Sequence, residues 1–402
     1  MSARDAAHDR LAARLSTAIG RLEDPSTPMV VVDLDAFDAN LADLVRRAAG
    51  TPIRVASKSI RIPALLARAL AHPSVAGVLS YNLREALWLA ENDVCDDMVV
   101  GYPTVDRGAL RRLARDERLR ARVTLMIDDT AHLDLIDECR DPDVALKVAI
   151  DIDAGLRWGP SHVGPKRSPL YDAAEVVALA RAAQHRGLVV DGVMTYEGQV
   201  AGVQDDVPGQ RARSMIVRRL KGASIAQLNE RRRRIAEALA EVVELRFWNA
   251  GGSGSIESTV ADPEVTEVAA GSGLLVPGLF DHYQSFRPRP AAYFGVPVVR
   301  RPSAGVATVA GGGFIASGPA GKDRLPIPWA PSGLAVTALE GVGEVQTPLT
   351  GPGAAALRVG DWVWFRHAKS GELAEHTNVV HLVHAEEVVD TVPSYRGLGL
   401  AW

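Results

Sequence analysis

Short apolar runs alternate with longer helix-like segments along the first two thirds of the chain. Eight of these runs come before residue 254, at residues 29–34, 53–57, 75–80, 97–101, 122–128, 144–151, 188–195 and 245–252. Strands that are apolar at successive positions are typical of a parallel sheet buried on both faces. Eight of them, separated by helices over about 250 residues, predict an α/β fold of the (β/α)8 barrel type. A doubly wound open sheet is the alternative, because periodicity alone does not separate the two.

The pattern changes near Phe286. Residues 286–302 are rich in proline. The segments after them lack helical periodicity and are separated by turns that contain glycine or proline. Such segments predict short strands, so we expect a smaller, mainly β domain. The predicted organisation is an N-terminal extension over residues 1–26, a barrel over residues 27–285 and a C-terminal β domain over residues 286–402.

Composition narrows the class of protein. The 402 residues are 47% hydrophobic and 23% charged, which is ordinary for a globular protein. The net charge of −4 does not favour a nucleic-acid or membrane partner, and we interpret the arginines at residues 231–234 as a solvated helix face. Cys95 and Cys139 have no metal or disulfide spacing. With no signal-peptide pattern and no apolar run of about 20 residues, we expect a cytoplasmic protein.

One lysine stands where a buried strand is predicted to end. Lys58 directly follows the run at residues 53–57. In a β/α barrel the C-terminal ends of the strands carry the chemistry. A lysine held there among apolar strands loses hydration, and its neutral amine can form a Schiff base with a carbonyl compound. The alternative is an exposed loop lysine, which is the more common situation.

Two turns made of small residues follow later strands of the predicted barrel. They lie within residues 249–255 and 269–275, and their central residues are Gly251, Gly252, Ser253, Gly271, Ser272 and Gly273. Backbone N–H groups and serine hydroxyls in such turns can bind an anion. A lysine together with a phosphate-binding cup is the arrangement that pyridoxal phosphate requires. Glycine is also common in turns that bind nothing.

Two further strand ends carry side chains suited to a cofactor. Arg157 lies in the turn at residues 151–159, where it could donate to the phenolic oxygen of pyridoxal phosphate. Tyr196 follows the run at residues 188–195, where it could pack on the cofactor or relay a proton. A surface arginine and a packing tyrosine are the alternative explanations.

These segments resemble the fold-type III pyridoxal phosphate enzymes, whose barrel is similar to that of alanine racemase. Within that group the chain most resembles the D-threonine aldolase and D-serine dehydratase branch, in particular bacterial proteins described as amino acid deaminase/aldolase. The resemblance lies in residues 27–41, 54–59, 153–159, 250–254, 270–273 and 392–397. It implies that Lys58 holds the cofactor and that the two glycine–serine turns bind its phosphate. It also implies a homodimer in which one β domain completes the partner's site.

The resemblance implies a lyase that depends on pyridoxal phosphate and acts on a D-3-hydroxy amino acid, by retro-aldol cleavage or by dehydration and deamination. An amino acid racemase is the first alternative. It needs a second base opposite Lys58, for which Tyr283 and Tyr395 are candidates by residue type. A non-catalytic pyridoxal phosphate-binding protein is the second alternative, although its small single-barrel relatives have no added β domain.

The expected metal motif is altered in this chain. Enzymes of the resembling branch bind a divalent metal through His-x-Cys or His-x-Asp in the C-terminal domain, followed by an asparagine. Read from its histidine, the segment here is His367-Ala368-Lys369, and read back from Asn378 it is Glu372-Leu373-Ala374. Neither alignment gives two good ligands, since lysine repels a cation and alanine has no donor atom.

Other residues of the same segment keep the question of a metal open. Glu372, Glu375 and His376 are the candidates for a variant metal site. Without a metal, a base or acid must act near the substrate hydroxyl. His367, His376 and Tyr196 are the candidates for that catalytic role, because imidazole can exchange a proton near neutral pH.

Overall fold

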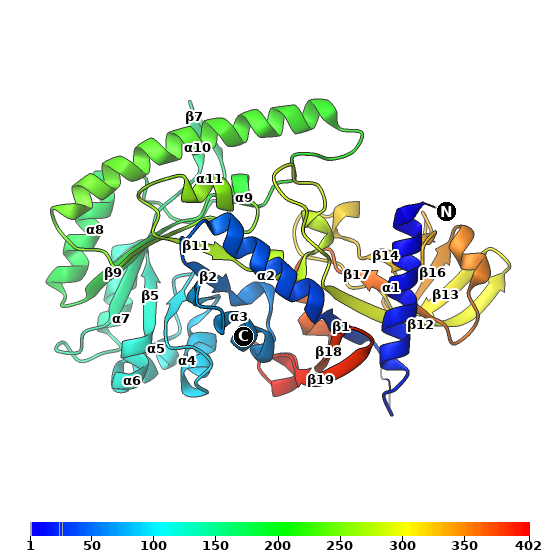
Figure 1. The fold of residues 1–402 in the computed structure, drawn as a ribbon. Helices are drawn as coiled ribbons and strands as arrows, with labels where there is room; N and C mark the ends of the chain where they lie inside the picture. The colour runs from blue at the N-terminus through cyan, green and yellow to red at the C-terminus, as the bar shows by residue number, and fades with distance from the viewer. Residues whose placement is uncertain (1, 24, 26) are drawn as a thin grey trace.

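Eight parallel strands close into a barrel, and a second, mostly β unit lies beside it (Figure 1). The structure is a computed structural model, and it describes residues 2–23, 25 and 27–402. The predicted (β/α)8 barrel is therefore confirmed, and closure of the sheet excludes the doubly wound alternative. No helix among the described residues is long and apolar enough to cross a membrane.

The strands follow one another around the barrel in chain order, with the last paired to the first. They are β2 (Ile53–Ala56), β3 (Val75–Ser80), β4 (Met98–Val100), β5 (Val123–Ile127), β6 (Lys147–Asp151), β9 (Val189–Thr195), β10 (Phe247–Ala250) and β11 (Glu267–Ala270). A small hairpin of β7 (Leu156–Trp158) and β8 (Ser161–Val163) follows β6. All eight barrel strands are apolar along most of their length, as a sheet covered by helices requires.

Most helices that surround the barrel lie between these strands in the sequence. The helices are α2 (Leu34–Ala48), α3 (Pro63–Leu70), α4 (Leu83–Glu91), α5 (Arg107–Arg115), α6 (Glu117–Arg122), α7 (Thr130–Asp137), α8 (Ala173–His185), α9 (Gly198–Ala201), α10 (Arg211–Ala240), α11 (Ile256–Val260) and α12 (Ser272–Leu275). Of these, α2 precedes β2 and α12 follows β11. The 30-residue α10 is the long green helix along the upper edge of the barrel in Figure 1.

The first predicted barrel strand is not part of the barrel. β1 (Met29–Asp33) pairs antiparallel with β12 (Ala292–Ser303) and parallel with β18 (Val379–His384) in the C-terminal sheet. The eighth barrel strand is instead β11, which was not among the eight predicted strands and ends at the second glycine–serine turn. A continuous apolar run fits either sheet equally well, which is why the pattern counted eight strands correctly but assigned one to the wrong sheet.

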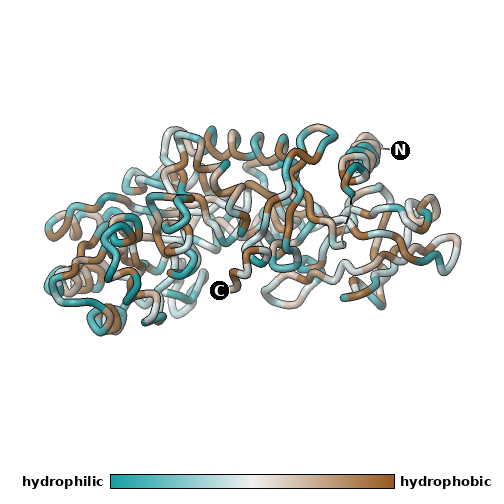
Figure 2. The backbone as a smooth tube through the Cα atoms, turned by 90° about the horizontal axis from the view of Figure 1, so that it is seen from below, coloured by the Kyte–Doolittle hydropathy of each residue, from teal (hydrophilic) through white to brown (hydrophobic). Residues whose placement is uncertain are grey.

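The C-terminal unit is a nine-stranded sheet built mainly after residue 291. Its other strands are β13 (Val306–Ala310), β14 (Ile327–Ala330), β15 (Ala335–Val336), β16 (Gln346–Thr350), β17 (Trp362–Arg366) and β19 (Glu387–Pro393). The N-terminal helix α1 (Ala3–Ile19) packs against this unit through Leu15 and Ile19. Hydrophobic segments run through both units in Figure 2, while hydrophilic ones gather in the outer loops and helix faces.

The barrel interior is layered along its axis. Near the N-terminal ends of the strands, the fully buried Arg54 pairs with Glu267 at 2.7 Å and with Asp97 at 3.1 Å. Above this charged layer lies an apolar cluster that includes Met126, Met194, Phe247 and residues of β4 and β6. The apolar layer separates the charged end of the barrel from the opposite, C-terminal end.

Candidate active site

A cavity of about 320 Å³ opens at the C-terminal end of the barrel strands. Its lining comes from the strand ends, from Leu279 and Phe280, and from Ser317, Gly318, Arg324, Lys369 and Ser370 of the β domain. This is the end at which β/α barrels place their chemistry. The volume lies at the low end of the roughly 300–1,000 Å³ typical of ligand pockets. The site therefore suits a small ligand held between the two units.

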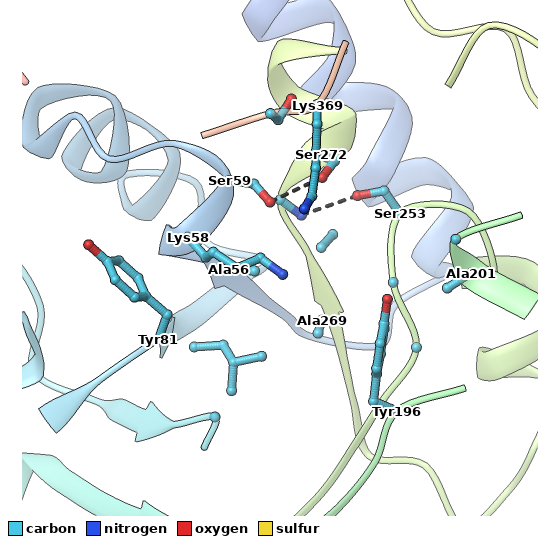
Figure 3. A pocket seen from close by; sticks show the side chains of 18 of the residues that line it. Ala56, Lys58, Ser59, Tyr81, Tyr196, Ala201, Ser253, Ala269, Ser272 and Lys369 are labelled. Atoms are coloured by element: carbon cyan, nitrogen blue, oxygen red, sulfur yellow. Dashed lines mark hydrogen bonds between the residues drawn. The ribbon is translucent and has the colours of Figure 1, made fainter. Parts of the chain in front are cut away.

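Lys58 lies in the cavity wall, in the short 3₁₀ turn η1 (Ser57–Ser59) that ends β2. Its neighbours Ser57 and Ser59 are buried, and the Ser57 hydroxyl donates to the carbonyl of Leu79 at 3.2 Å. Figure 3 shows the lysine amine directed into the pocket on the side facing Tyr196. Within the described part of the chain, no hydrogen bond or ion pair engages this amine. The end of β2 therefore places in the cavity an amine that has no partner among the described residues and can act as a nucleophile.

The turn that carries Lys58 is packed against the β domain. Gly371 has φ of +93°, and a Cβ built on it would lie 1.9 Å from the carbonyl oxygen of Lys58. Only glycine allows this approach and this backbone conformation. Arg61 donates to the same carbonyl at 3.0 Å and forms an ion pair with Glu375 at 2.6 Å. The segment at residues 371–375 thus fixes the position of Lys58.

The two glycine–serine turns meet at the cavity. The hydroxyl oxygen of Ser253 accepts hydrogen bonds from the backbone N–H groups of Gly271, at 3.1 Å, and Gly273, at 3.0 Å. The hydroxyls of Ser59 and Ser272 lie 3.0 Å apart (Figure 3). Serine oxygens and backbone N–H groups from three strand ends are therefore gathered in one place, as an anion-binding cup requires.

A buried carboxylate holds one of these turns. Gly251 has φ of +79°, and its N–H donates to Glu197 at 3.0 Å. Thr259 donates to the other oxygen of Glu197 at 2.5 Å. Arg232, from α10, forms ion pairs with Glu197 at 3.3 Å and with Asp262 at 3.2 Å. Glu197 therefore positions the turn.

The arginines at residues 231–234 differ from the predicted solvated face. Arg233 and Arg234 are exposed and pair with Glu230, but Arg231 and Arg232 are buried. The helical pattern did not reveal this, because the partners of Arg232 come from strand ends far away in the sequence. A run of four arginines on a helix covers more than one face, so the four do not share one environment.

Tyr196 lines the cavity, whereas Arg157 does not. The Tyr196 ring points into the pocket in Figure 3, and burial raises the pKa of its hydroxyl. Arg157 instead stacks on Tyr171 with its guanidinium 3.6 Å from the ring centroid, and its side chain is 47% exposed. The expectation that Arg157 reaches the cofactor is thus not supported. The arginines in the lining are Arg167 and Arg324, and Arg167 lies over the rings of Tyr102 and Tyr196.

A buried carboxyl group lies behind Tyr196. Asp151, the last residue of β6, lines a small gap together with Arg167 and Tyr196. Burial, and then the neighbouring charge of Asp128, raise the pKa of Asp151 to about 7. Its proton is therefore exchangeable near neutral pH, in a gap that Tyr196 also lines.

The two histidines expected at the site lie outside the cavity lining. His367 is buried, its Nε2 lies 3.0 Å from the hydroxyl of Ser370, and burial lowers its pKa to about 3. His376 stacks on Phe314 with ring centroids 4.3 Å apart. Of these residues, only Ser370 lines the cavity. The structure therefore does not bring either histidine to the place of a catalytic base.

The residues present do not fit the metal that the resemblance implies. Among residues 2–23, 25 and 27–402, no group of three or more histidine, cysteine, aspartate or glutamate side chains is arranged to hold a metal ion. Both oxygens of Glu372 are taken, by the N–H and hydroxyl of Ser317 and by Lys369. An ammonium group and a buried histidine turned to Ser370 are not a donor set for a divalent cation.

The residues do fit pyridoxal phosphate. The uncommitted amine of Lys58 suits its aldehyde, the cup of serines and N–H groups suits its phosphate, and the Tyr196 ring suits its flat pyridine ring. At Gly252 a Cβ would lie 3.0 Å from that of Ala201 and 3.5 Å from the Tyr196 ring. The bare backbone there leaves room beside the tyrosine.

The sequence model of one protein family, described as alanine racemase, N-terminal domain, matches residues 32–276, well over half of the chain. Proteins of this barrel type imply pyridoxal phosphate as the cofactor, in agreement with the fit of the cavity. Among curated protein sequences, none matches the chain.

Solved structures with the same fold include enzymes of several activities. D-threonine aldolase from Filomicrobium marinum is 21% identical, with a TM-score of 0.78 over 92% of this chain and 95% of that chain. D-threo-3-hydroxyaspartate dehydratase from Delftia sp. HT23 is 19% identical, with a TM-score of 0.70 over 94% and 98%. Alanine racemase of Clostridium difficile 630 is 14% identical, with a TM-score of 0.59 over 93% and 100%. At these identities the likeness establishes the fold alone.

Proposed function

Because this chain belongs to the family of the alanine racemase N-terminal domain, we propose that it is a lyase dependent on pyridoxal phosphate that acts on D-3-hydroxy amino acids. The observation that carries the proposal is the uncommitted amine of Lys58, which faces a cavity walled by two glycine–serine turns. The likeness in fold to an aldolase and a dehydratase supports the choice of substrate class.

Each residue of the site has a distinct task in this proposal. When bound, pyridoxal phosphate draws electrons away from Cα of an attached amino acid and so weakens the bonds to that atom. Lys58 Nζ holds the cofactor and takes the proton from Cα. Ser253, Ser272 and the N–H groups of the turns bind the phosphate. Tyr196 supports the flat ring, and Arg167 supplies positive charge for a carboxylate.

The cavity is small, and most of its lining residues are glycine, alanine or serine. After the cofactor is seated, the remaining space suits a small amino acid. Water is kept from the reacting carbon by Leu279 and Phe280 on one side and Leu79 on another. The β domain closes the remaining side through residues 317–318 and 369–370.

The racemase alternative has less support in the residues of this chain. The hydroxyl of Tyr283 donates to the carbonyl of Ala201 at 2.8 Å, and that of Tyr395 donates to Glu85 at 2.7 Å. Both tyrosines are buried, and neither belongs to the cavity lining. The two candidates for a second base are thus engaged in packing, which favours the lyase.

Product analysis tests the proposal. The purified protein, loaded with pyridoxal phosphate, is incubated with D-serine and D-threonine and with their L-enantiomers. We expect pyruvate and 2-oxobutanoate from dehydration, or glycine with an aldehyde from retro-aldol cleavage, from the D-enantiomers alone. Interconversion of enantiomers without these products would instead establish a racemase. Light scattering tests the accompanying proposal that the protein is a homodimer, which a monomer would contradict.

A further inference from the structure

A second lysine reaches the cavity from the β domain. Lys369 follows β17 in the sequence, and its ammonium group donates to the hydroxyl of Ser317 at 2.5 Å and pairs with Glu372 at 3.2 Å. Figure 3 shows this side chain entering the pocket from the β-domain segment, while Lys58 enters from the barrel. Two of the three N–H bonds of Lys369 have partners, which leaves one for a ligand.

The cavity holds very few groups that can exchange a proton. Of the described residues in its lining, four are basic and none is a carboxylate or a histidine; the basic ones are Lys58, Arg167, Arg324 and Lys369. Arginine does not release its proton in proteins, and Tyr196 stays a neutral phenol because burial disfavours its ionised form. Besides the tyrosine hydroxyls of the lining, the two lysines are therefore the groups able to transfer protons to or from a substrate.

The two reactions in the proposed function make opposite demands on a group near the β-hydroxyl. Retro-aldol cleavage needs a base that removes the hydroxyl proton, whereas dehydration needs an acid that protonates the departing oxygen. Glu372 and Ser317 hold Lys369 as an ammonium group, which is an acid. A metal ion, which would otherwise act on this oxygen, has no donor set here.

We propose, building on the lyase function, that Lys369 is the general acid for departure of the β-hydroxyl and that the reaction is a dehydration that needs no metal ion. The Cα proton passes to Lys58 Nζ, and the electron pair of that bond becomes the second Cα–Cβ bond. The Cβ–O bond breaks with its pair on oxygen, which takes a proton from Lys369 Nζ and leaves as water. Solvent at the cavity mouth then takes the proton from Lys58 Nζ and returns one to Lys369 Nζ, so both lysines are restored.

The leaving group provides a direct test. Chloride departs without a proton, so elimination from D-3-chloroalanine does not need an acid, whereas elimination from D-serine does. In Lys369→Gln we expect kcat for D-serine to fall by about 100-fold or more, the usual contribution of general acid catalysis. Pyruvate formation from D-3-chloroalanine should change little. Equal loss on both substrates, or no loss on either, would overturn the role of Lys369.

Two further variants separate charge from proton transfer. Lys369→Arg keeps the positive charge but does not release a proton, so we expect it to remain impaired on D-serine. Activity of this variant equal to that of the unmodified protein would contradict the proposal. Lys322→Gln is the matched control, since Lys322 is an exposed lysine of a nearby 3₁₀ turn and lies outside the cavity lining. It should leave both reactions unchanged.

Metal content gives a readout that does not depend on turnover. Elemental analysis of the purified protein should find no stoichiometric divalent metal, and dialysis against EDTA should leave D-serine turnover unchanged. Loss of turnover that zinc or manganese restores would overturn the inference. Failure of the unmodified protein to form pyruvate from either D-serine or D-3-chloroalanine would instead contradict the lyase function itself, so the two failures are distinguishable.

Discussion

Charged side chains have different environments at the two ends of the barrel. At the N-terminal end, Arg54 is fully buried and bound by Glu267 and Asp97, while Arg246 pairs with Asp97 and Asp191, each at 2.7 Å. At the C-terminal end, four basic side chains line a cavity with no acidic side chain among the described lining residues. The comparison teaches that charges with complete protein partners serve the fold, whereas charges left open to a cavity serve a ligand.

Breaking the charged layer should have the largest effect on stability. Arg54→Met leaves Glu267 buried with the Asn249 amide, 2.9 Å away, as its remaining hydrogen-bond donor. We expect the free energy of unfolding to fall by about 3–5 kcal/mol, the usual result of removing one partner of a buried ion pair. Urea denaturation measures it. Arg233→Met, in an exposed pair with Glu230, is the control and should leave the midpoint of urea denaturation unchanged.

The buried carboxyl group near the cavity should make stability depend on pH. Because the pKa of Asp151 is raised to about 7 from its ordinary 3.8, the native state keeps a proton that the unfolded chain releases between these values. Stability therefore falls as pH rises from about 4 to about 7. Asp151→Asn should remove this loss, gaining on the order of 2–4 kcal/mol over the unmodified protein at pH 8 and little at pH 4. Parallel stability curves for the two proteins would contradict this.

The contacts that position the anion-binding turn should affect the affinity of the protein for the cofactor. Glu197→Gln removes the charge that accepts the Gly251 N–H and pairs with Arg232. We expect pyridoxal phosphate to bind about tenfold more weakly, equivalent to losing one hydrogen bond to a charged group. Fluorescence titration of the apoprotein measures this affinity. Glu175→Gln, in the exposed cap of α8, is the control, and an equal change there would remove the special role of Glu197.

The smallest effect is expected at an arginine that the sequence singled out. Arg157 stacks on Tyr171 at the surface and lies outside the cavity lining. Arg157→Ala should leave cofactor affinity and turnover unchanged. Arg167→Ala, which removes a lining arginine, should raise KM for the amino acid substrate. Weaker cofactor binding or slower turnover in Arg157→Ala, with an unchanged KM in Arg167→Ala, would place Arg157 in the site. That result would contradict the assignment of the lining residues.

The sequence predicted the features that depend on local pattern. Apolar runs predicted the barrel, and the strand end at Lys58 and the two glycine–serine turns pointed to residues that the structure does gather at one cavity. The pattern failed for β1, because a buried strand looks alike in either sheet. It also failed for Arg232 and Lys369, whose environments are made by contacts across 35 and 52 residues of the chain.

The histidines show the same limit. His367 and His376 were singled out because imidazole is the usual base near neutral pH. The burial of His367 beside Ser370 and the stacking of His376 on Phe314 follow from how the β domain packs, and no local pattern reports that packing. The departure from the expected metal motif, by contrast, was visible in the sequence and pointed to the lysine that the structure places in the cavity.

The most direct test of the account is which lysine holds pyridoxal phosphate, because the cavity contains two. The protein loaded with the cofactor is reduced with borohydride, which fixes a lysine-bound carbonyl irreversibly, and its peptides are analysed by mass spectrometry. The account predicts the cofactor on Lys58, at the end of β2, and none on Lys369. A cofactor fixed on Lys369, or on no lysine of the cavity, would contradict it.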